Sequence, residues 1–289
     1  MIILVILVVL FAFFLALGLI DGNRFEVVKE TFELQNLRKD CRFVLISDVH
    51  NKVYGEKNAP LIKAVKQMNP DFIIVAGDLV TANPGEDMTP GIELVKILSR
   101  DFTIYYGLGN HEMKIKERHD KFGEQFALLK KSLTDSGIVW LENESAEIQA
   151  YNIRITGLSL ALEYFAHFHI RKMEENVLEN AIGKPDKTKC NLLIAHNPDY
   201  FSEYAKWGAD LTLSGHVHGG IMRLPWIGGV LAPSYRLFPK YDGGVFRENG
   251  ALMLLGRGMG AHTIPLRFFN PAQLYEVTLK PPKTNNSLP

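Results

Sequence analysis

The sequence contains a set of Asp, Asn and His residues whose types and spacing could bind divalent metal ions. All of them offer nitrogen or oxygen ligand atoms, and they are Asp48, His50, Asp78, Asn110, His196, His216 and His218. Such a mixture suits Mn, Fe, Zn, Co or Ni, whereas Mg and Ca usually prefer shells made of oxygen alone. Seven ligands are too many for one tetrahedral ion, so we expect two ions about 3.5–4 Å apart that share one bridging carboxylate.

These residues would also set the charge of the site. Two divalent cations bring four positive charges, and the carboxylates of Asp48 and Asp78 return two negative ones, so the site keeps about +2. A site of that charge binds anions, and we expect a phosphate ester as its substrate. The ion pair would clamp the phosphate oxygens and supply a bridging hydroxide as the nucleophile, because metal-bound water loses its proton far more readily than bulk water.

Each motif taken alone also has a simpler structural explanation. Asp-x-His after a strand is common by chance, Gly-Asp often forms a turn, and a single histidine such as His196 is more often a hydrogen-bonded core residue. The stretch Gly-His-x-His-Gly-Gly at 215–220 is more specific, because its glycines let backbone approach closely. The joint occurrence of these motifs, in this order after apolar runs, favours the metal site.

Short apolar runs bounded by turn residues lead into these donors and predict buried strands. The strands are expected at 42–47, 71–76, 102–106, 191–195 and 211–213, with two later ones at 251–255 and 273–279. In open α/β sheets, sites form outside the carboxyl ends of strands. Five strands whose carboxyl ends meet would therefore position the donors.

Helical and extended patterns lie between these strands. Apolar residues recur at helix spacing from Leu61 to Met68 and from Phe122 to Leu133, whereas 148–157 alternates like a strand with one exposed face. Early strands that alternate with helices predict an α/β sheet with helices packed on it. The length of 289 residues suits one large domain with a sizeable core.

Overall charge and composition argue against several classes of protein. The chain has 32 Lys and Arg against 32 Asp and Glu, and this zero balance gives no support for a nucleic-acid binder. Its two cysteines, Cys41 and Cys190, are too few for a disulfide framework. With 47% hydrophobic and 22% charged residues, the composition also excludes a mostly disordered chain.

The first twenty residues form a separate apolar segment. Residues 1–20 contain no charged side chain, and a helix of that length spans about 30 Å, the thickness of the hydrocarbon core of a bilayer. A signal peptide usually has a shorter apolar stretch after basic residues, so we expect an uncleaved single-pass anchor in the cell membrane. Cleavage at the small-residue triplet Ala16-Leu17-Gly18 is the alternative.

The rest of the chain reads as one domain with short flanks. We expect a linker and lead-in at 21–40, the catalytic domain at 41–279 and a polar tail at 280–289. Within the domain, apolar and aromatic residues crowd 221–246, where prolines and glycines interrupt any regular period. This segment is either a buried irregular loop or an apolar lip over the metal site that receives a lipid-like substrate.

The motifs together resemble the calcineurin-like metallophosphoesterase superfamily. Its pattern is present as Asp48-Val49-His50, Gly77-Asp78, Gly109-Asn110-His111-Glu112, His196 and Gly215-His216-Val217-His218. With its apolar N-terminal segment, the chain is most similar to the membrane-associated bacterial branch of YkuE- and YaeI-like phosphodiesterases. The resemblance covers residues 41–279 and implies a two-sheet β-sandwich flanked by helices, with a di-metal centre on the strand-end loops.

The resemblance also implies a role for each motif residue. One ion would take Asp48, His50, Asp78 and His218, and the other would take Asp78, Asn110, His196 and His216, with Asp78 as the bridge. His111 would sit beside the scissile phosphate, stabilise charge and protonate the leaving oxygen. Glu112 would orient His111 through a carboxylate–imidazole hydrogen bond. The two ions would be Mn, Fe or Zn.

Four further residues are candidates for substrate contact or for support of the site. Asn51 could touch the substrate or cap a turn. Arg257 and Arg267 could bind a phosphate or form ion pairs. His262 could line the cleft.

These inferences predict a di-metal phosphoester hydrolase, either a phosphodiesterase or a phosphatase, acting on a membrane or envelope phosphate ester that could be lipid-linked. A UDP-diacylglucosamine-type pyrophosphatase is the first alternative, and a non-catalytic binding module of the same fold is the second. The sequence predicts no nucleic-acid partner and no particular oligomeric state. The side of the membrane has two opposed indications: sparse basic residues after the span favour the cytoplasm, and the resemblance to envelope-facing relatives favours the outside.

Overall fold

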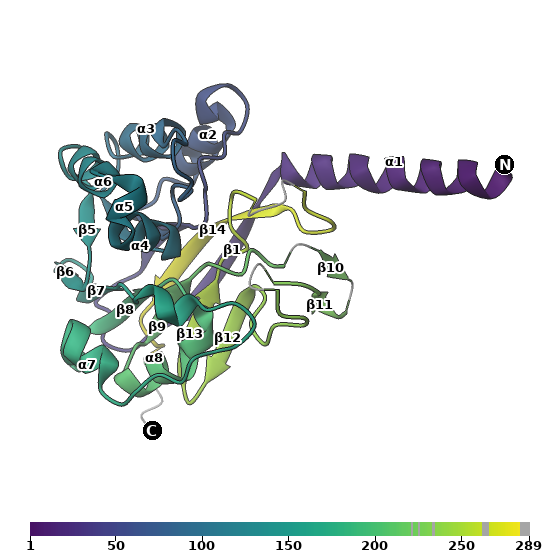
Figure 1. Ribbon diagram of the computed structural model, residues 1–289. Coiled ribbons are helices and arrows are strands. Elements are labelled where there is room, and N and C mark those ends of the chain that lie inside the picture. The colour runs from purple at the N-terminus through teal and green to yellow at the C-terminus, as the bar shows by residue number, and fades with distance from the viewer. Residues whose placement is uncertain (221, 225, 233–234, 262–265, 284–289) are drawn as a thin grey trace.

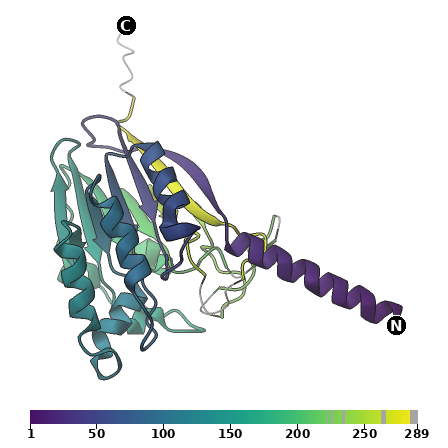
Figure 2. The same cartoon turned by 90° about the horizontal axis from the view of Figure 1, so that it is seen from above.

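The computed structural model describes the whole chain except residues 221, 225, 233–234, 262–265 and 284–289. Its centre is a pair of six-stranded sheets packed face to face, with helices on the outer face of each sheet (Figure 1, Figure 2). The predicted two-sheet sandwich flanked by helices is confirmed. All seven predicted strands are present, each with bounds within two residues of the expected ones.

The first sheet carries the early strands of the chain. In spatial order it contains β1 (Phe25–Glu33), β14 (Ala272–Lys280), β2 (Cys41–Ile46), β3 (Phe72–Ala76), β4 (Ile104–Gly107) and β5 (Val139–Leu141). The strands β2 to β5 run parallel, because helices connect them across one face of the sheet. Their carboxyl ends therefore share one edge.

The second sheet repeats this arrangement with later strands. In spatial order it contains β12 (Gly244–Glu248), β13 (Ala251–Leu255), β9 (Leu211–Ser214), β8 (Cys190–Ala195), β7 (Ile153–Leu158) and β6 (Glu144–Ile148). The four central strands are parallel, and β12 and β6 are antiparallel edges. The loops after β8 and β9 meet the loops after β2 and β3, so both sheets present their carboxyl ends to one site.

The helices and short elements fall into groups by position. On the side of the first sheet lie α2 (Ala59–Met68), α3 (Thr89–Leu98), α4 (Asn110–Glu117), α5 (His119–Phe122) and α6 (Gln125–Thr134). On the side of the second sheet lie α7 (Val177–Ile182) and α8 (Phe201–Trp207). Short 3-10 turns are η1 (Glu56–Asn58), η2 (Leu162–Phe165) and η3 (Pro198–Tyr200), and a small ribbon pairs β10 (Arg223–Leu224) with β11 (Gly228–Gly229).

Apolar side chains alternate along the central strands between two cores. On β2, Phe43 and Leu45 pack between the two sheets, whereas Val44 and Ile46 pack under the helices of the first sheet. All four are buried, because both faces of the strand are covered. This double burial explains why the strands appear in the sequence as continuous apolar runs.

Local backbone geometry corrects two sequence predictions. The extended pattern at 148–157 is not one strand, because β6 ends at Ile148 and β7 begins at Ile153, with Asn152 at φ +60° in the turn. The helical pattern from Phe122 to Leu133 is divided into α5 and α6 at Gly123, whose φ of +52° suits glycine. In addition, the segment expected as a lead-in at 21–40 contains β1, which pairs in parallel with β14.

The apolar N-terminal segment forms α1 (Ile2–Gly22), which projects from the domain (Figure 1, Figure 2). By length and composition it could cross a membrane, and only 6% of its most apolar stretch is buried. Its last turn is attached to the domain, since Gly18 and Asp21 are buried and the Arg267 backbone N–H donates to the Gly18 carbonyl at 3.2 Å.

Candidate metal centre

The donors predicted from the sequence meet at one place, and they come from both sheets. They are Asp48 and His50 after β2, Asp78 after β3, Asn110 after β4, His196 after β8, and His216 and His218 after β9. Most of these side chains are buried, and the rest are half-buried. Parallel strands of two facing sheets therefore converge their loops on one cluster of nitrogen and oxygen ligands.

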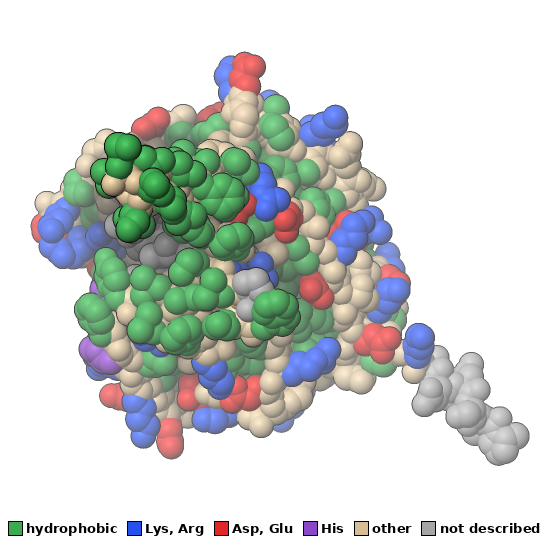
Figure 3. Space-filling view, turned by 90° about the vertical axis from the view of Figure 1, so that its right-hand side faces the viewer, with side chains coloured by type: hydrophobic (Ala, Val, Ile, Leu, Met, Phe, Trp, Pro, Cys, Tyr) green, Lys and Arg blue, Asp and Glu red, His purple; other side chains and the backbone are tan. Residues whose placement is uncertain are grey.

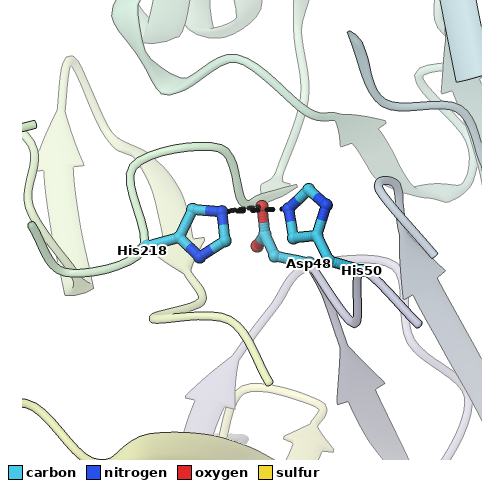
Figure 4. A group of neighbouring side chains, drawn as sticks. All are labelled: Asp48, His50 and His218. Carbon is cyan, nitrogen blue, oxygen red and sulfur yellow. Dashed lines mark hydrogen bonds and ion pairs between the residues drawn. The ribbon is translucent and has the colours of Figure 1, made fainter. Parts of the chain in front are cut away.

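The first half of the cluster contains Asp48, His50 and His218 (Figure 4). Figure 4 shows the two imidazoles approaching the Asp48 carboxylate from opposite sides. The Nε2 atoms of the two histidines are 3.1 Å apart, and His218 Nε2 is 3.4 Å from Asp48 Oδ1. The three side chains can therefore present one ligand atom each to a common point.

The second half contains Asp78, His196 and His216, with Asn110 beside them. His196 Nε2 is 3.1 Å from Asp78 Oδ2, and His216 Nδ1 is 2.8 Å from Asn110 Oδ1. Asp78 Oδ2 is also 3.7 Å from His50 Nε2, which belongs to the first half. Asp78 thus lies between the two halves, where a carboxylate could serve both.

These distances fit divalent cations. Two ligand atoms that each lie about 2.1 Å from one ion are about 3.0–3.4 Å apart at octahedral or tetrahedral angles, close to the spacings above. Among the described residues, none gives the buried Asp48 Oδ2 a hydrogen-bond partner. A buried carboxylate oxygen needs such a partner or a cation, and a metal ion would supply it.

Hydrogen bonds to the far ring nitrogens prepare two histidines for metal binding. His196 Nδ1 donates to the Ala76 carbonyl at 2.6 Å, and His218 Nδ1 donates to the Gly260 carbonyl at 3.3 Å. In the neutral ring this places the lone pair on Nε2, which faces the carboxylates of the cluster. Outer bonds of this kind are typical of metal-ligating histidines.

In His111 the Nδ1 atom accepts a hydrogen bond, whereas in His196 and His218 it donates one. The Ala82 backbone N–H donates to His111 Nδ1 at 2.7 Å, so the neutral ring carries its proton on Nε2. Burial lowers the pKa of His111, which keeps the ring neutral near pH 7. The ring lies 4.6 Å from that of His50, beside the cluster. It therefore offers a hydrogen-bond donor where the ligands offer lone pairs.

Several donors have a strained backbone. Five of the predicted ligands have φ between +47° and +74°, the left-handed region that non-glycine residues rarely adopt, and they are Asp48, His50, Asp78, His216 and His218. Each such residue costs about 1–3 kcal/mol and persists only where the surrounding structure enforces it. Strained residues of this kind concentrate at functional sites, which supports a shared function for these five.

Two motif glycines are required by close approach. A Cβ on Gly109 would lie 2.1 Å from Asp78 Oδ1, and a Cβ on Gly215 would lie 2.4 Å from Asp48 Oδ2. The free space lets backbone amides orient the carboxylates, since His111 N–H donates to Asp78 Oδ1 at 2.8 Å. The glycines of the Gly-Asn-His-Glu and Gly-His-x-His motifs are therefore needed to leave space for the carboxylates of Asp78 and Asp48.

Glu112 has partners other than the expected imidazole. Its buried carboxylate accepts hydrogen bonds from the backbone N–H groups of Asp78, Leu79 and Gly109, at 2.8–2.9 Å, and from the Tyr106 hydroxyl at 2.8 Å. These bonds tie the loop after β3 to the loop after β4. Glu112 therefore shapes the loops that carry the site, and the Ala82 N–H orients His111.

The electrostatics of the cluster favour a cation. Burial raises the pKa of Asp48 to about 6, because the carboxylate loses its hydration. Burial alone would lower the pKa of His196, but the carboxylates of Asp78 and Asp48 outweigh it and raise that pKa to about 10. The two carboxylates thus draw positive charge to this point, and a divalent ion can supply that charge.

The remaining predicted residues have mixed outcomes. Arg267 is buried, and its guanidinium donates to the backbone carbonyls of Arg257, Gly258, Gly260 and Asn270, so it supports the loop that contains them. Arg257 is half-buried, and its Nε has no hydrogen-bond partner among the described residues. His262 lies outside the described residues.

Asn51 supports the loop that carries two of the predicted ligands. Its backbone N–H donates to the Leu79 carbonyl, and its Nδ2 donates to Glu86 Oε1 at 3.2 Å. Its buried Oδ1 has no hydrogen-bond partner within the described part of the chain. The residue therefore supports the loop after β2 and keeps one acceptor unused.

Two residues near the centre escaped the sequence reasoning. Asn270 is buried and its Nδ2 donates to the backbone carbonyls of His218 and Gly220, at 2.7 Å each. The ring of Phe165 in η2 packs edge-on against that of His216, with centroids 5.2 Å apart. Asn270 precedes a proline and reads as a turn, and Phe165 carries no chemical signal, so neither could be found from the motifs.

Comparison with known proteins places the same residues in one family domain. The family model for the calcineurin-like phosphoesterase domain matches residues 41–220. This range includes every donor of the cluster together with His111. The match accounts for 180 of the 289 residues, counted from the stated bounds.

Individual relatives agree with this match. The uncharacterised metallophosphoesterase YkuE of Bacillus subtilis is 26% identical over 246 residues, which cover 83% of this chain and 79% of that protein. Phosphodiesterase YaeI of Escherichia coli is 24% identical over 171 residues, covering 58% of this chain and 56% of YaeI. UDP-2,3-diacylglucosamine pyrophosphatase LpxG of Chlamydia muridarum is 22% identical over 281 residues, covering 81% and 82%.

Proposed function

We propose that this chain, which belongs to the YkuE and YaeI branch of the calcineurin-like phosphoesterase family, works through two divalent ions. Membership of that family makes it a hydrolase of phosphoester bonds. The observation that carries this proposal is the position of Asp78. Its Oδ2 lies 3.7 Å from His50 Nε2 on one side and 3.1 Å from His196 Nε2 on the other. A carboxylate between two groups of ligands can contact both ions of a two-ion centre, whose ions lie about 3.5–4 Å apart.

We propose two ligand sets that share Asp78. The first is Asp48, His50, Asp78 and His218, and the second is Asp78, Asn110, His196 and His216. Bound divalent ions would neutralise phosphate oxygens and lower the pKa of a coordinated water. The nitrogen-rich ligand set favours Mn, Fe or Zn over Mg and Ca.

His111 is the proposed catalytic residue outside the ligand sets. Its Nδ1 accepts a hydrogen bond from the Ala82 amide, which places the ring proton on Nε2, and we assign this N–H to a phosphate oxygen or a leaving group at the edge of the centre. A donor in a buried site interacts strongly with developing negative charge, because water does not screen it. The role of His111 is thus to stabilise and protonate, while the other histidines hold metal.

The proposed substrate is a phosphate ester of the membrane or envelope. This assignment rests on α1, whose apolar length suits a membrane anchor, and on its attachment to the same domain that carries the metal centre. We retain residues 41–279 as the catalytic domain, to which β1 adds an edge strand. Protease access to the domain in intact cells decides between the outer face of the membrane and the cytoplasm.

Hydrolysis with controlled metal content tests the proposal. The full chain in detergent, stripped of metal and reloaded with Mn, is expected to hydrolyse an aryl phosphate monoester or diester and to lose that activity in a chelator. Activity that survives complete metal removal would overturn the mechanism. Tight phosphate binding without turnover would favour a binding module. A panel that includes UDP-diacylglucosamine tests the activity after which the relative LpxG is named.

A further inference from the structure

Exposed apolar side chains gather on the side of the domain from which α1 projects. Six of them, each at least half exposed, define what we call the apolar face: Trp226, Ile227, Tyr235, Leu237, Phe238 and Phe269. Figure 3 looks along α1 toward this side and shows hydrophobic side chains gathered beside the helix. The side chain of Trp226 is fully exposed. The expectation of a buried loop at 221–246 is therefore wrong for the described residues of this face.

The apolar face and the end of α1 share one support. The segment that ends with Asn270 contacts α1, because Arg267 N–H donates to the Gly18 carbonyl and a Cβ on Gly18 would lie 2.8 Å from the Phe268 ring. The same segment holds the ribbon of the apolar face, since Arg223 N–H donates to the Phe268 carbonyl at 3.0 Å. The position of the face relative to α1 is thus determined by backbone contacts.

The charged residues that line the cavity of this face form an ion pair. A cavity of about 530 Å³ opens within the face, between Trp226, Ile227 and Phe269. The charged residues of this cavity are Arg223 and Asp242, which form an ion pair at 3.0 Å. Large exposed apolar patches on soluble surfaces are rare and mark sites of interaction, and Trp is enriched at the interface between membrane and water.

We propose that the apolar face docks on the lipid bilayer, at the same membrane surface where α1 leaves it. The argument for a bilayer rather than a protein is continuity. The apolar part of α1 reaches Ile20, its last turn contacts Phe268, and Phe269 of the apolar face is the next residue. If α1 spans the bilayer as proposed above, the face lies at the level of the lipid headgroups.

An apolar rim leads from the metal centre to the docked face. Phe165 packs edge-on against His216, and Phe168, three residues later, stacks on Tyr235 of the apolar face with ring centroids 5.6 Å apart. Docking would therefore bring one wall of the site against the lipid. A phosphate ester with an acyl chain could then reach the metals with its chain still in apolar surroundings, which deepens the proposed function.

Tryptophan quenching by brominated lipid tests the docking. The full chain is reconstituted in phosphatidylcholine–phosphatidylglycerol vesicles whose acyl chains carry bromine. The chain has three tryptophans, and Trp140 and Trp207 are buried, so Trp226 is the one that can report contact with lipid. We expect strong quenching of the intact chain and loss of most of that quenching in Trp226→Phe.

A matched control places a tryptophan elsewhere. Leu128 on α6 is also well exposed, and α6 lies on the far side of the domain from α1. Leu128→Trp in the Trp226→Phe background is expected to respond to aqueous acrylamide but not to brominated lipid. Ile227→Asp with Leu237→Asp is expected to reduce the quenching of Trp226 while hydrolysis of a soluble aryl phosphate stays unchanged.

Two outcomes would overturn the docking. In the first, the chain sediments with vesicles through α1 while Trp226 responds only to acrylamide. In the second, Trp226 is shielded from both quenchers by a second copy or a protein partner. Hydrolysis of the soluble aryl phosphate is measured in the same samples, so a failure of docking is distinguished from a failure of the proposed hydrolase.

Discussion

Asn270 connects the metal centre with the base of the N-terminal helix. Its Nδ2 donates to the backbone carbonyl of His218 at 2.7 Å, and its backbone N–H donates to the Asp21 carboxylate at 3.3 Å. Asp21 belongs to the last turn of α1, and His218 is a proposed ligand. One buried residue therefore holds the loop after β9 and the end of the apolar helix in a common frame.

We predict that Asn270→Ala weakens metal binding as well as folding. The change leaves the carbonyls of His218 and Gly220 without a donor and costs about 1–3 kcal/mol of folding free energy. Because it also loosens the His218 loop, metal affinity should fall by about 10- to 100-fold. Thermal unfolding and metal titration of the full chain in detergent measure the two effects separately.

Asn191→Ala is the matched control for this prediction. Asn191 is also buried, and its Nδ2 donates to the carbonyls of Asp186 and Lys189, away from the centre. It should lower stability and leave metal affinity unchanged. Equal effects of the two variants on metal affinity would contradict a specific role for Asn270.

We predict that Asp78→Asn abolishes turnover and weakens both metals. The amide keeps the size of the side chain but removes the negative charge that lies between His50 and His196. The loss of turnover should exceed the roughly 10- to 100-fold effect of outer-shell changes. Metal content by elemental analysis should fall below two ions per chain. Asp210→Asn, a carboxylate that accepts the Asn191 N–H, should keep both activity and metal.

His111→Ala is predicted to separate catalysis from metal binding. Removing a general acid or hydrogen-bond donor typically lowers turnover by about 10²- to 10⁴-fold. The backbone N–H of His111 still orients Asp78 after the change, so the metal content should remain that of the parent chain. If elemental analysis instead shows metal loss, His111 is a ligand and its assignment here is wrong.

Glu142 is predicted to make stability depend on acid pH. Burial acts to raise its pKa, but Lys116 and Lys130, with ammonium nitrogens at 2.7 and 2.9 Å, and the Trp140 indole outweigh it and lower the pKa to about 2. A depressed pKa in the folded state stabilises above the unfolded value of 4.5, and this stabilisation is lost as the pH falls toward 2.

Glu142→Gln tests this dependence through unfolding at several pH values. The variant should be less stable than the parent at pH 7, and the difference should shrink between pH 4.5 and 2, because the parent loses its paired carboxylate there. Glu163→Gln is the control, since the ion pair of Glu163 with Arg171 is exposed and contributes little. A difference that stays constant with pH would contradict the prediction.

The strand-end donors could be predicted because their information is local. A strand covered on both faces is a continuous apolar run, and the residue that follows it must lie at the edge of the sheet. Asp48, Asp78 and His196 each follow such a run within two residues. The same locality explains why 1–20 could be identified as an apolar helix.

Other features depend on partners far away in the chain. The sequence left the role of Arg267 open because a guanidinium looks the same in the sequence whether it meets phosphate or backbone carbonyls. Asn270 supports the site through a hydrogen bond to the His218 carbonyl, which is 52 residues away in the sequence. The local sequence around Asn270 predicts only a turn and gives no indication of that hydrogen bond. The strand β1 joins the sheet only because β14, from the other end of the domain, lies beside it.

The sequence by itself determined which chemistry this protein can perform, because residue types and their order after buried strands are local properties. It also determined that residues 1–20 are an apolar segment long enough to span a membrane as a helix. The tertiary structure alone decided that two sheets face each other, so that His216 N–H donates to the carboxylate of Asp48, 168 residues away, at 2.7 Å. It also decided which ring nitrogen of His111 and of His196 faces the site and which surface lies beside α1, because contacts between distant segments set both.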